Sequence, residues 1–217
     1  MSIIHKDIAA IREDYSKSQL DENQVLLDPM AQFEQWFAAA ISSEVLEPNA
    51  MQLSTLKADG YPSSRIVLLK DITPEGFRFF TNYNSDKGVA ISHHPQVSLL
   101  FFWPELQRQV RIEGLAEYTT EADSDEYFNS RPKGSRIGAI ASAQSQPIAN
   151  RSSLEEQVKI LTDKYAETDE VPRPQHWGGY LVKPTRLEFW QGRSSRLHDR
   201  IVYQLVDGAW KQERLAP

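Results

Sequence analysis

Short apolar runs separated by turn residues fill the middle of the chain, and this pattern constrains the fold more than any other feature. Residues 51–57 and 63–70 flank Asp59-Gly60, a dipeptide that favours the positive φ angles of a tight hairpin turn. Other strand-like runs of this region cover residues 77–82, 96–103 and 108–118. The connections are short and show no βαβ rhythm, so we expect an antiparallel sheet.

Helical periodicity precedes these strands. Asp28 followed by Pro29 is the pattern of a helix N-cap with proline at the first helical position. The apolar face that follows recurs at helical spacing through Met30, Phe33, Trp36, Phe37, Ala40 and Ile41. A shorter helix is expected over residues 8–15.

A second helical region follows the central strands. Ser152 and Glu155 have the spacing of a capping box. The apolar stripe of this helix consists of Leu154, Val158, Leu161 and Tyr165. The tail then returns to strand-like runs at residues 178–182, 186–191, 201–205 and 209–214, the last two joined by Asp207-Gly208.

This succession of elements indicates a mainly β protein of the α+β class. Six or more short antiparallel strands with inserted helices favour a closed or split barrel, which hides the edges of its sheet. A length of 217 residues suits one domain over 1–217 with a sizeable core. The N-terminal segment 1–20 is expected to be mobile.

The composition excludes several classes of protein. Cysteine is absent, which removes thiol nucleophiles, disulfides and cysteine-ligated metal sites. A net charge of −6 argues against a nucleic-acid partner. The longest apolar runs, such as residues 97–103, are too short to cross a bilayer, and the N-terminus has no signal-like apolar stretch. We therefore expect a cytoplasmic protein without a membrane or nucleic-acid partner.

Common catalytic signatures are also absent. The sequence has no G-x-G-x-x-G, no P-loop and no G-x-S-x-G. His93 and His94 would point to different faces of a helix end, so they are a poor metal pair. His198 and Asp199 would project to opposite faces of a strand, which disfavours a proton relay between them. No metal site is expected.

Basic and hydroxyl side chains gather in several segments instead. Arg65 and Lys70 bound an apolar strand and would project to opposite faces. Lys87 follows Ser85 at an expected helix start, where backbone N–H groups and a lysine can receive a phosphate. The segment 127–138 adds a phenol, an arginine and a serine, which are Tyr127, Arg131 and Ser135.

The tail carries a further set of cations. Arg196, His198 and Arg200 would share one strand face at a period of two, and such a row is costly without an anionic or electron-rich partner. Alone, each of these segments also fits a solvated basic loop or an exposed strand edge. Together they favour a site for a small phosphate.

These segments resemble the pyridoxine/pyridoxamine 5'-phosphate oxidase family. The resemblance runs from about Arg12 to Pro217 and rests on several blocks. They are Arg65–Lys70, the Ser-Arg-Pro-x-x-Ser-x-Ile-Gly of residues 130–138, Gln144-Ser145, Glu188–Gly192, Arg196–Arg200 and the terminal Arg-Leu-Ala-Pro. The resemblance implies a homodimer of FMN-binding antiparallel split barrels, with FMN in a cleft at the subunit interface and shared between the two copies.

The resemblance also implies roles for individual residues. The FMN site would comprise Arg65, Ile66, Val67, Leu68, Leu69, Lys70, Phe80, Thr81, Lys87, Gln109, Gln144, Ser145, Trp190 and Arg200. The substrate phosphate would bind Lys70, Tyr127, Arg131 and Ser135. Arg196 and His198 would be the catalytic pair over the pyridine ring, with Leu197 between them. The segment Arg12, Glu13, Asp14 and Tyr15 would contact the substrate as a lid.

The activity that the resemblance implies is oxidation of pyridoxamine and pyridoxine 5'-phosphate to pyridoxal 5'-phosphate. A hydride would pass from substrate C4' to flavin N5, and O2 would take the electrons to give H2O2. One position departs from the family pattern, because Asp86 stands where a second basic residue is common. We expect this carboxylate to weaken FMN binding.

Three other functions remain open from the sequence. A split-barrel flavoprotein could reduce another substrate with a nicotinamide donor, but it should lack the set Tyr127, Arg131 and Ser135. A flavin- or pyridoxal-phosphate-binding protein without activity would not need Arg196 and His198. A nucleic-acid-binding barrel is disfavoured by the net charge of −6.

Overall fold

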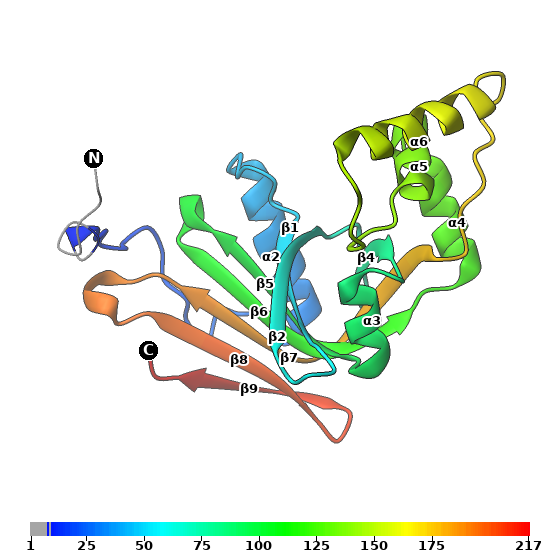
Figure 1. Cartoon of the computed structure of the whole chain (residues 1–217). Coiled ribbons are helices and arrows are strands. Elements are labelled where there is room, and N and C mark those ends of the chain that lie inside the picture. The colour runs from blue at the N-terminus through cyan, green and yellow to red at the C-terminus, as the bar shows by residue number, and fades with distance from the viewer. Residues whose placement is uncertain (1–7, 9) are drawn as a thin grey trace. The chain divides into compact units, whose positions relative to one another are not determined.

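The computed structural model describes residue 8 and residues 10–217, and its strands form an antiparallel sheet (Figure 1). The order of the nine-stranded sheet is β2-β1-β5-β6-β7-β4-β3, with β8 pairing to β7 and β9 pairing to β8. The chain divides into two compact units built from separate segments. The first comprises the described residues up to Pro48 together with residues 100–112 and 186–217, and the second comprises residues 49–99 and 113–185.

The second unit contains two hairpins that carry much of the predicted site. Strands β1 (Ala50–Leu56) and β2 (Pro62–Leu68) pair from Ala50↔Leu68 to Leu56↔Pro62, as the Asp59-Gly60 turn predicts. Strands β3 (Asp71–Thr73) and β4 (Gly76–Asn82) form the other hairpin. Strand β4 also pairs with the first part of β7 (Trp177–Gln191), and helix α3 (Asp86–His93) follows β4. The side chain of Ser85 caps the start of α3.

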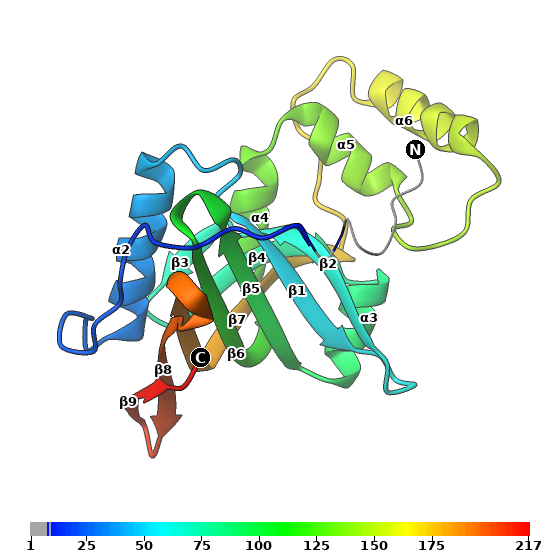
Figure 2. The same cartoon turned by 90° about the vertical axis from the view of Figure 1, so that its left-hand side faces the viewer.

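Three helices of the second unit surround a small core of their own. They are α4 (Glu121–Ser130), α5 (Lys133–Ala141) and α6 (Arg151–Lys164), and Figure 2 shows α5 and α6 side by side. The core consists of Phe128, Ile137, Val171 and Trp177, and the predicted stripe residues Val158, Leu161 and Tyr165 pack against it. The predicted capping box is wrong, because Asn150 caps α6 by accepting a 2.9 Å hydrogen bond from Ser153 N.

The first unit holds helix α2 (Pro29–Ser42) and the C-terminal strands. Asp28 caps α2 as predicted, and Phe33 and Trp36 pack in an aromatic core with Phe101, Phe189 and other rings. Ile41 does not belong to this face, because it is 56% exposed on the last turn. The strands of this region are β8 (Asp199–Val206), β9 (Ala209–Leu215) and the ends of β5 (Gln96–Trp103), β6 (Arg108–Tyr118) and β7.

Some predicted boundaries differ from the structure. The helix expected over residues 8–15 is wrong beyond position 10, because residues 11–16 have no regular secondary structure. The runs 178–182 and 186–191 are one continuous strand, β7, and the second strand of the first hairpin ends at Leu68 rather than Lys70. Most of the segment 1–9 lies outside the described residues. A single domain over 1–217 stays a prediction.

Candidate functional site

A basic pocket lies within the second unit and collects most of the predicted phosphate and cofactor residues. Its volume is about 670 Å³. The predicted residues that line it are Ile66, Val67, Leu68, Lys70, Phe80, Thr81, Lys87, Tyr127, Arg131, Ser135 and Gln144. The pocket therefore brings together the complete predicted phosphate set and a large part of the predicted FMN set.

Arg131 is the most informative residue of this basic pocket. Its guanidinium carbon lies 4.6 Å from the ring centroid of Trp177 and 5.6 Å from that of Phe128. Desolvation by burial lowers the pKa of Arg131. Its buried Nη1 has no hydrogen-bond partner among the residues that the structure describes. A buried, unpaired N–H of a charged group is costly, and an anion in the pocket would remove that cost.

A second set of donors surrounds the start of α3. Lys87 Nζ donates to Ser85 Oγ at 3.2 Å and to Gln144 Oε1 at 2.9 Å. Burial lowers the pKa of Lys87, and the nearby charge of Arg65 lowers it further, whereas Asp86 opposes the shift. The Asp86 N–H donates to Ser145 Oγ, which places Ser145 beside this helix start. Two cations held this close favour an anionic ligand of high charge, such as a phosphate dianion.

Six predicted cofactor residues do not line the pocket: Arg65, Leu69, Gln109, Ser145, Trp190 and Arg200. The Arg65 guanidinium donates to Thr55 Oγ1 at 2.8 Å and to the carbonyls of Leu53 and Ser63, so it is held against β1. The side chain of Leu69 is buried in the core. Lys70 lines the pocket but follows the end of β2, so the strand alternation that predicts opposite faces for Arg65 and Lys70 does not extend to Lys70.

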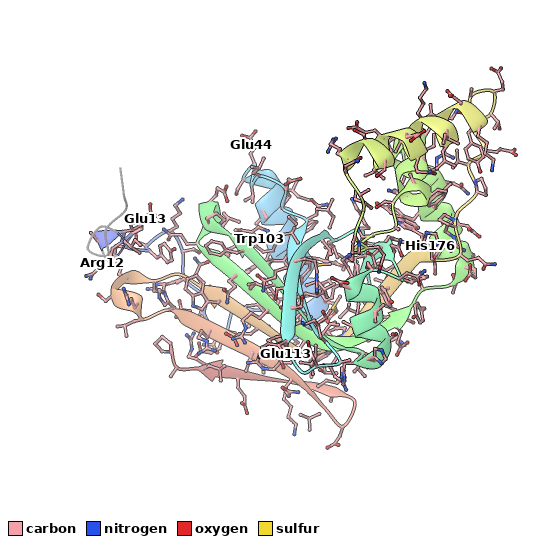
Figure 3. All side chains as sticks on the ribbon, in the orientation of Figure 1. Arg12, Glu13, Glu44, Trp103, Glu113 and His176 are labelled. Atoms are coloured by element: carbon pink, nitrogen blue, oxygen red, sulfur yellow. The ribbon has the colours of Figure 1, made fainter. Side chains whose placement is uncertain are left out.

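A second cluster lies within the first unit, around Tyr15. The ring of His198 lies 4.6 Å from that of Trp190, and Tyr15 lies 6.0 Å from Trp190 and 6.1 Å from His198. Gly192 leaves the space for this arrangement, because a Cβ there would lie 2.4 Å from the Tyr15 ring. The adjoining cavity of about 670 Å³ is lined by predicted substrate residues, which are Arg12, Glu13, Asp14, Tyr15, Arg196 and His198. Arg12 and Glu13 are labelled in Figure 3.

A backbone hydrogen bond to His198, in this Tyr15 cluster, determines which ring nitrogen carries the proton of the neutral imidazole. The Arg193 N–H donates to His198 Nδ1 at 3.1 Å, so a neutral imidazole carries its proton on Nε2. Burial lowers the pKa of His198, and the charge of Arg196 adds to this effect while Asp199 opposes it. The Asp199 carboxylate accepts from Leu20 N and from the side chain of Arg193. The predicted strand alternation of His198 and Asp199 does not apply, because His198 precedes β8.

The predicted strand face of Arg196, His198 and Arg200 is wrong. Strand β8 begins only at Asp199, and Arg196 lies in a 3₁₀ turn with a φ of +62°. Arg196 and His198 both precede the strand, so period-two alternation relates neither of them to Arg200. Leu197 is 68% exposed and does not line the cavity of the Tyr15 cluster.

Arg200 belongs to a network around a buried carboxylate that the sequence reasoning did not assign. Glu188 is only 1% exposed, and its side chain accepts from Arg200 at 2.9 Å and from Arg186 at 2.8 Å. Arg111 lies 3.5 Å from the same carboxylate. A charged residue inside the apolar run Leu-Glu-Phe-Trp was the available signal, because such a residue must be paired when buried. Gln109, also predicted at the FMN site, lies on β6 and is partly buried.

The structure also bears on a metal site and on a membrane-spanning segment. Among the described residues, no group of three or more His, Cys, Asp or Glu side chains could hold a metal ion. A search of the same residues finds no helix that is long and apolar enough to cross a membrane.

Solved structures identify the class of protein. The chain superimposes on PhzG from Burkholderia lata 383, solved in complex with tetrahydrophenazine-1-carboxylic acid, with a TM-score of 0.85 and 30% identity, over 90% of this chain and 95% of that one. A pyridoxamine 5'-phosphate oxidase-related, FMN-binding protein from Nostoc punctiforme has the same fold, with a TM-score of 0.68 at 16% identity, over 85% of this chain and 97% of that one. These likenesses identify the fold as the antiparallel split barrel of the FMN-binding, pyridoxamine 5'-phosphate oxidase-like class.

Sequence comparisons then give the family. Residues 37–163 match the family model of pyridoxamine 5'-phosphate oxidase, and residues 177–217 match that of the pyridoxine 5'-phosphate oxidase C-terminal dimerisation region. The pyridoxine/pyridoxamine 5'-phosphate oxidase of Cyanothece sp. is 52% identical over 97% of this chain and 98% of its own length. That of Actinobacillus pleuropneumoniae serotype 5b is 54% identical over 97% of this chain and its whole length. The chain belongs to the pyridoxine/pyridoxamine 5'-phosphate oxidase family.

Proposed function

We propose that this chain oxidises pyridoxamine 5'-phosphate and pyridoxine 5'-phosphate to pyridoxal 5'-phosphate. The observation that carries the proposal is the buried Arg131 Nη1, which lacks a partner among the described residues and belongs to a pocket lined by Lys70, Tyr127 and Ser135. These four side chains supply an arginine fork, an ammonium and two hydroxyls, a donor set suited to a phosphate monoester. Relatives with more than half of their residues identical carry this activity in their names.

The donors at the start of α3 fit the phosphate of FMN. Lys87 and the backbone of α3 would hold it, with Thr81, Gln144 and Ser145 beside them and Arg65 adding charge from behind. FMN held there would supply the redox chemistry, as acceptor of a hydride from substrate C4', with O2 as the final electron acceptor and H2O2 as the product. The protein contributes position and electrostatics: the basic pocket fixes the phosphate of the substrate and thereby limits how its ring can be placed.

Arg196 and His198 are the groups that we propose to act on the substrate ring. Neutral His198, with its proton on Nε2, can donate a hydrogen bond to the substrate without adding a second charge next to Arg196. Arg196 would orient the substrate and stabilise charge at the reacting centre. Tyr15, which packs against Trp190 and His198, would cover this face of the substrate.

We further propose a homodimer in which both copies build each FMN site. The region 177–217, which matches a dimerisation model, also contains Trp190, Arg196, His198 and Arg200. A mixture of two inactive variants, Arg131→Ala and Arg196→Ala, tests this sharing. Random exchange of subunits would give heterodimers with one intact site and restore about a quarter of wild-type activity. Activity that stays at the level of the separate variants would exclude a site in which Arg131 and Arg196 come from different copies.

The catalytic proposal is tested by anaerobic mixing of the FMN-loaded protein with pyridoxamine 5'-phosphate. We expect the flavin absorption band to bleach, and to recover with formation of the aldehyde when air is admitted. Pyridoxamine without its phosphate is the matched control and should bleach the flavin far more slowly. A flavin that stays oxidised would exclude the oxidase function and leave a flavoprotein that uses another substrate.

The PhzG complex favours one alternative substrate class. The ligand in that complex is a tricyclic carboxylic acid, and the two chains share 30% identity. The same anaerobic assay with tetrahydrophenazine-1-carboxylic acid distinguishes the two classes. We expect no bleaching, because the basic pocket presents four phosphate donors to a ligand that has no phosphate.

The cytoplasmic location remains a proposal, which cell fractionation would test.

A further inference from the structure

Trp177 lies between the helical core of the second unit and the basic pocket. Its side chain is 6% exposed, it belongs to the core of Phe128, Ile137 and Val171, and it also lines the pocket. Its backbone is held on both sides: the N–H donates to Pro174 O at 3.0 Å, and the carbonyl accepts from Arg173 Nη1 at 2.7 Å. Trp177 is therefore a fixed wall of the pocket rather than a mobile side chain.

The ring of Trp177 also belongs to a tier of nearly parallel aromatic rings. Phe80 and Tyr127 stack with their centroids 4.0 Å apart, and Trp177 lies 5.8 Å from Phe80 and 6.1 Å from Tyr127, with interplanar angles of 14° and 7°. Phe128 meets Trp177 edge-on at 5.1 Å. These contacts fix the plane of the indole and hence the place where a cation can lie over its face.

The guanidinium of Arg131 occupies this place. It lies 4.6 Å from the Trp177 centroid, a distance at which the ring face attracts a cation. A face contact uses the flat side of the guanidinium and leaves its N–H edge for other partners. The buried Nη1 has none among the described residues, so the contact holds Arg131 in place while a donor stays unpaired.

We propose that Trp177 is a positioning residue for phosphate recognition, which holds the Arg131 guanidinium ready before the ligand arrives. This inference rests on the proposed function, because it takes Arg131 to be the phosphate-binding arginine. Arginine loses much rotamer freedom when it is fixed, and binding is stronger when that loss has already occurred in the free protein. Without the indole face, the Arg131 side chain would lose its rotamer freedom only when the ligand binds, and binding would be weaker.

The test compares two ligands that differ only by the phosphate. Dissociation constants of pyridoxal and pyridoxal 5'-phosphate are measured on the FMN-loaded protein. The constant of pyridoxal divided by that of pyridoxal 5'-phosphate is the ratio that gives the contribution of the phosphate. We expect Trp177→Leu to reduce this ratio about twofold to tenfold, the effect of one arginine that must be ordered on binding. Trp177→Phe keeps an aromatic face and should stay within about twofold of wild type. An unchanged ratio in Trp177→Leu overturns the proposal.

Arg131→Ala separates this inference from the proposed function. If Arg131→Ala lowers the ratio and Trp177→Leu does not, the positioning role is wrong and the phosphate assignment stands. If Arg131→Ala leaves the ratio unchanged, the phosphate assignment itself fails. In the double variant, Trp177→Leu should cause no further decrease, because it acts through Arg131, and an additional decrease also overturns the proposal. If Trp177→Leu does not fold, Trp177→Met replaces it, since a flexible thioether fills the space without an aromatic face.

Discussion

Glu188 gives the most direct test of how the first unit holds its arginines. Its buried carboxylate is the shared partner of Arg111, Arg186 and Arg200. Glu188→Gln keeps the shape of the side chain but removes the negative charge. Breaking a buried ion pair costs about 3–5 kcal/mol, because the remaining charge has no compensation. The arginine side chains are 19–44% exposed, so water offsets part of this loss, and we expect a decrease of about 2–3 kcal/mol in the free energy of unfolding.

Thermal and chemical denaturation of the FMN-free protein would measure this effect. For a chain of this size, about 2–4 °C of Tm corresponds to 1 kcal/mol, so we expect Tm to fall by roughly 4–12 °C. Glu117→Gln is a suitable control, because Glu117 pairs with Lys183 at the surface, where both side chains are about half exposed. The control should change the free energy of unfolding by less than about 1 kcal/mol. Glu188→Gln within 1 kcal/mol of wild type would refute the reasoning.

The pH dependence provides a second check on Glu188. Burial alone raises the pKa of this carboxyl, but hydrogen bonds from Arg200 and Arg186 and the charges of Arg200 and Arg111 prevail and lower it below 4.5. A carboxyl with a lowered folded-state pKa contributes stability above pH 4.5 and loses it as the pH falls through the folded-state pKa. The difference between wild type and Glu188→Gln should therefore shrink on acidification, and a constant difference would contradict the assignment.

Three further predictions concern the two sites. Asp86→Arg should tighten FMN binding by about threefold to tenfold at low salt, because it replaces a carboxylate beside Lys87 with a cation. Fluorescence titration would measure the dissociation constant, and an unchanged value would contradict this prediction. Gly192→Ala should displace Tyr15, since the new Cβ would lie 2.4 Å from its ring, and faster tryptic cleavage in the N-terminal segment would report the displacement. The pKa of His198 should lie below 6.5, so protonation of His198 destabilises the folded state as the pH falls below that value. A titration midpoint at or above 6.5, measured by NMR, would exclude this.

Much of the fold followed from local signals in the sequence. The Asp59-Gly60 turn predicted the β1–β2 pairing, and the runs 96–103 and 108–118 coincide with β5 and β6. The failures have local causes. Asn150 rather than Ser152 caps α6. Both residue types can cap a helix, so the sequence allowed either start. Ile41 fits the helical period but lies on the last turn of its helix, where more than half of its surface stays exposed.

The candidate sites depended more on tertiary structure. Tyr127, Arg131 and Ser135 are close in sequence, so their convergence with Lys70 in the basic pocket could be inferred. The turn at residues 194–196 could not be, because a positive φ at Arg196 breaks the strand pattern that the sequence suggests. Pairings over long sequence separations, such as Arg131 with Trp177, leave no periodic trace in one sequence.

The backbone near the C-terminus has a practical consequence for anyone preparing this protein. Arg200 pairs with Leu215 across β8 and β9, and its Nη1 donates to Ala216 O at 2.9 Å. A purification tag fused after Pro217 would extend the segment that holds this arginine. The flavin content of preparations with a retained and with a cleaved C-terminal tag should therefore be compared before binding constants are assigned to the native chain.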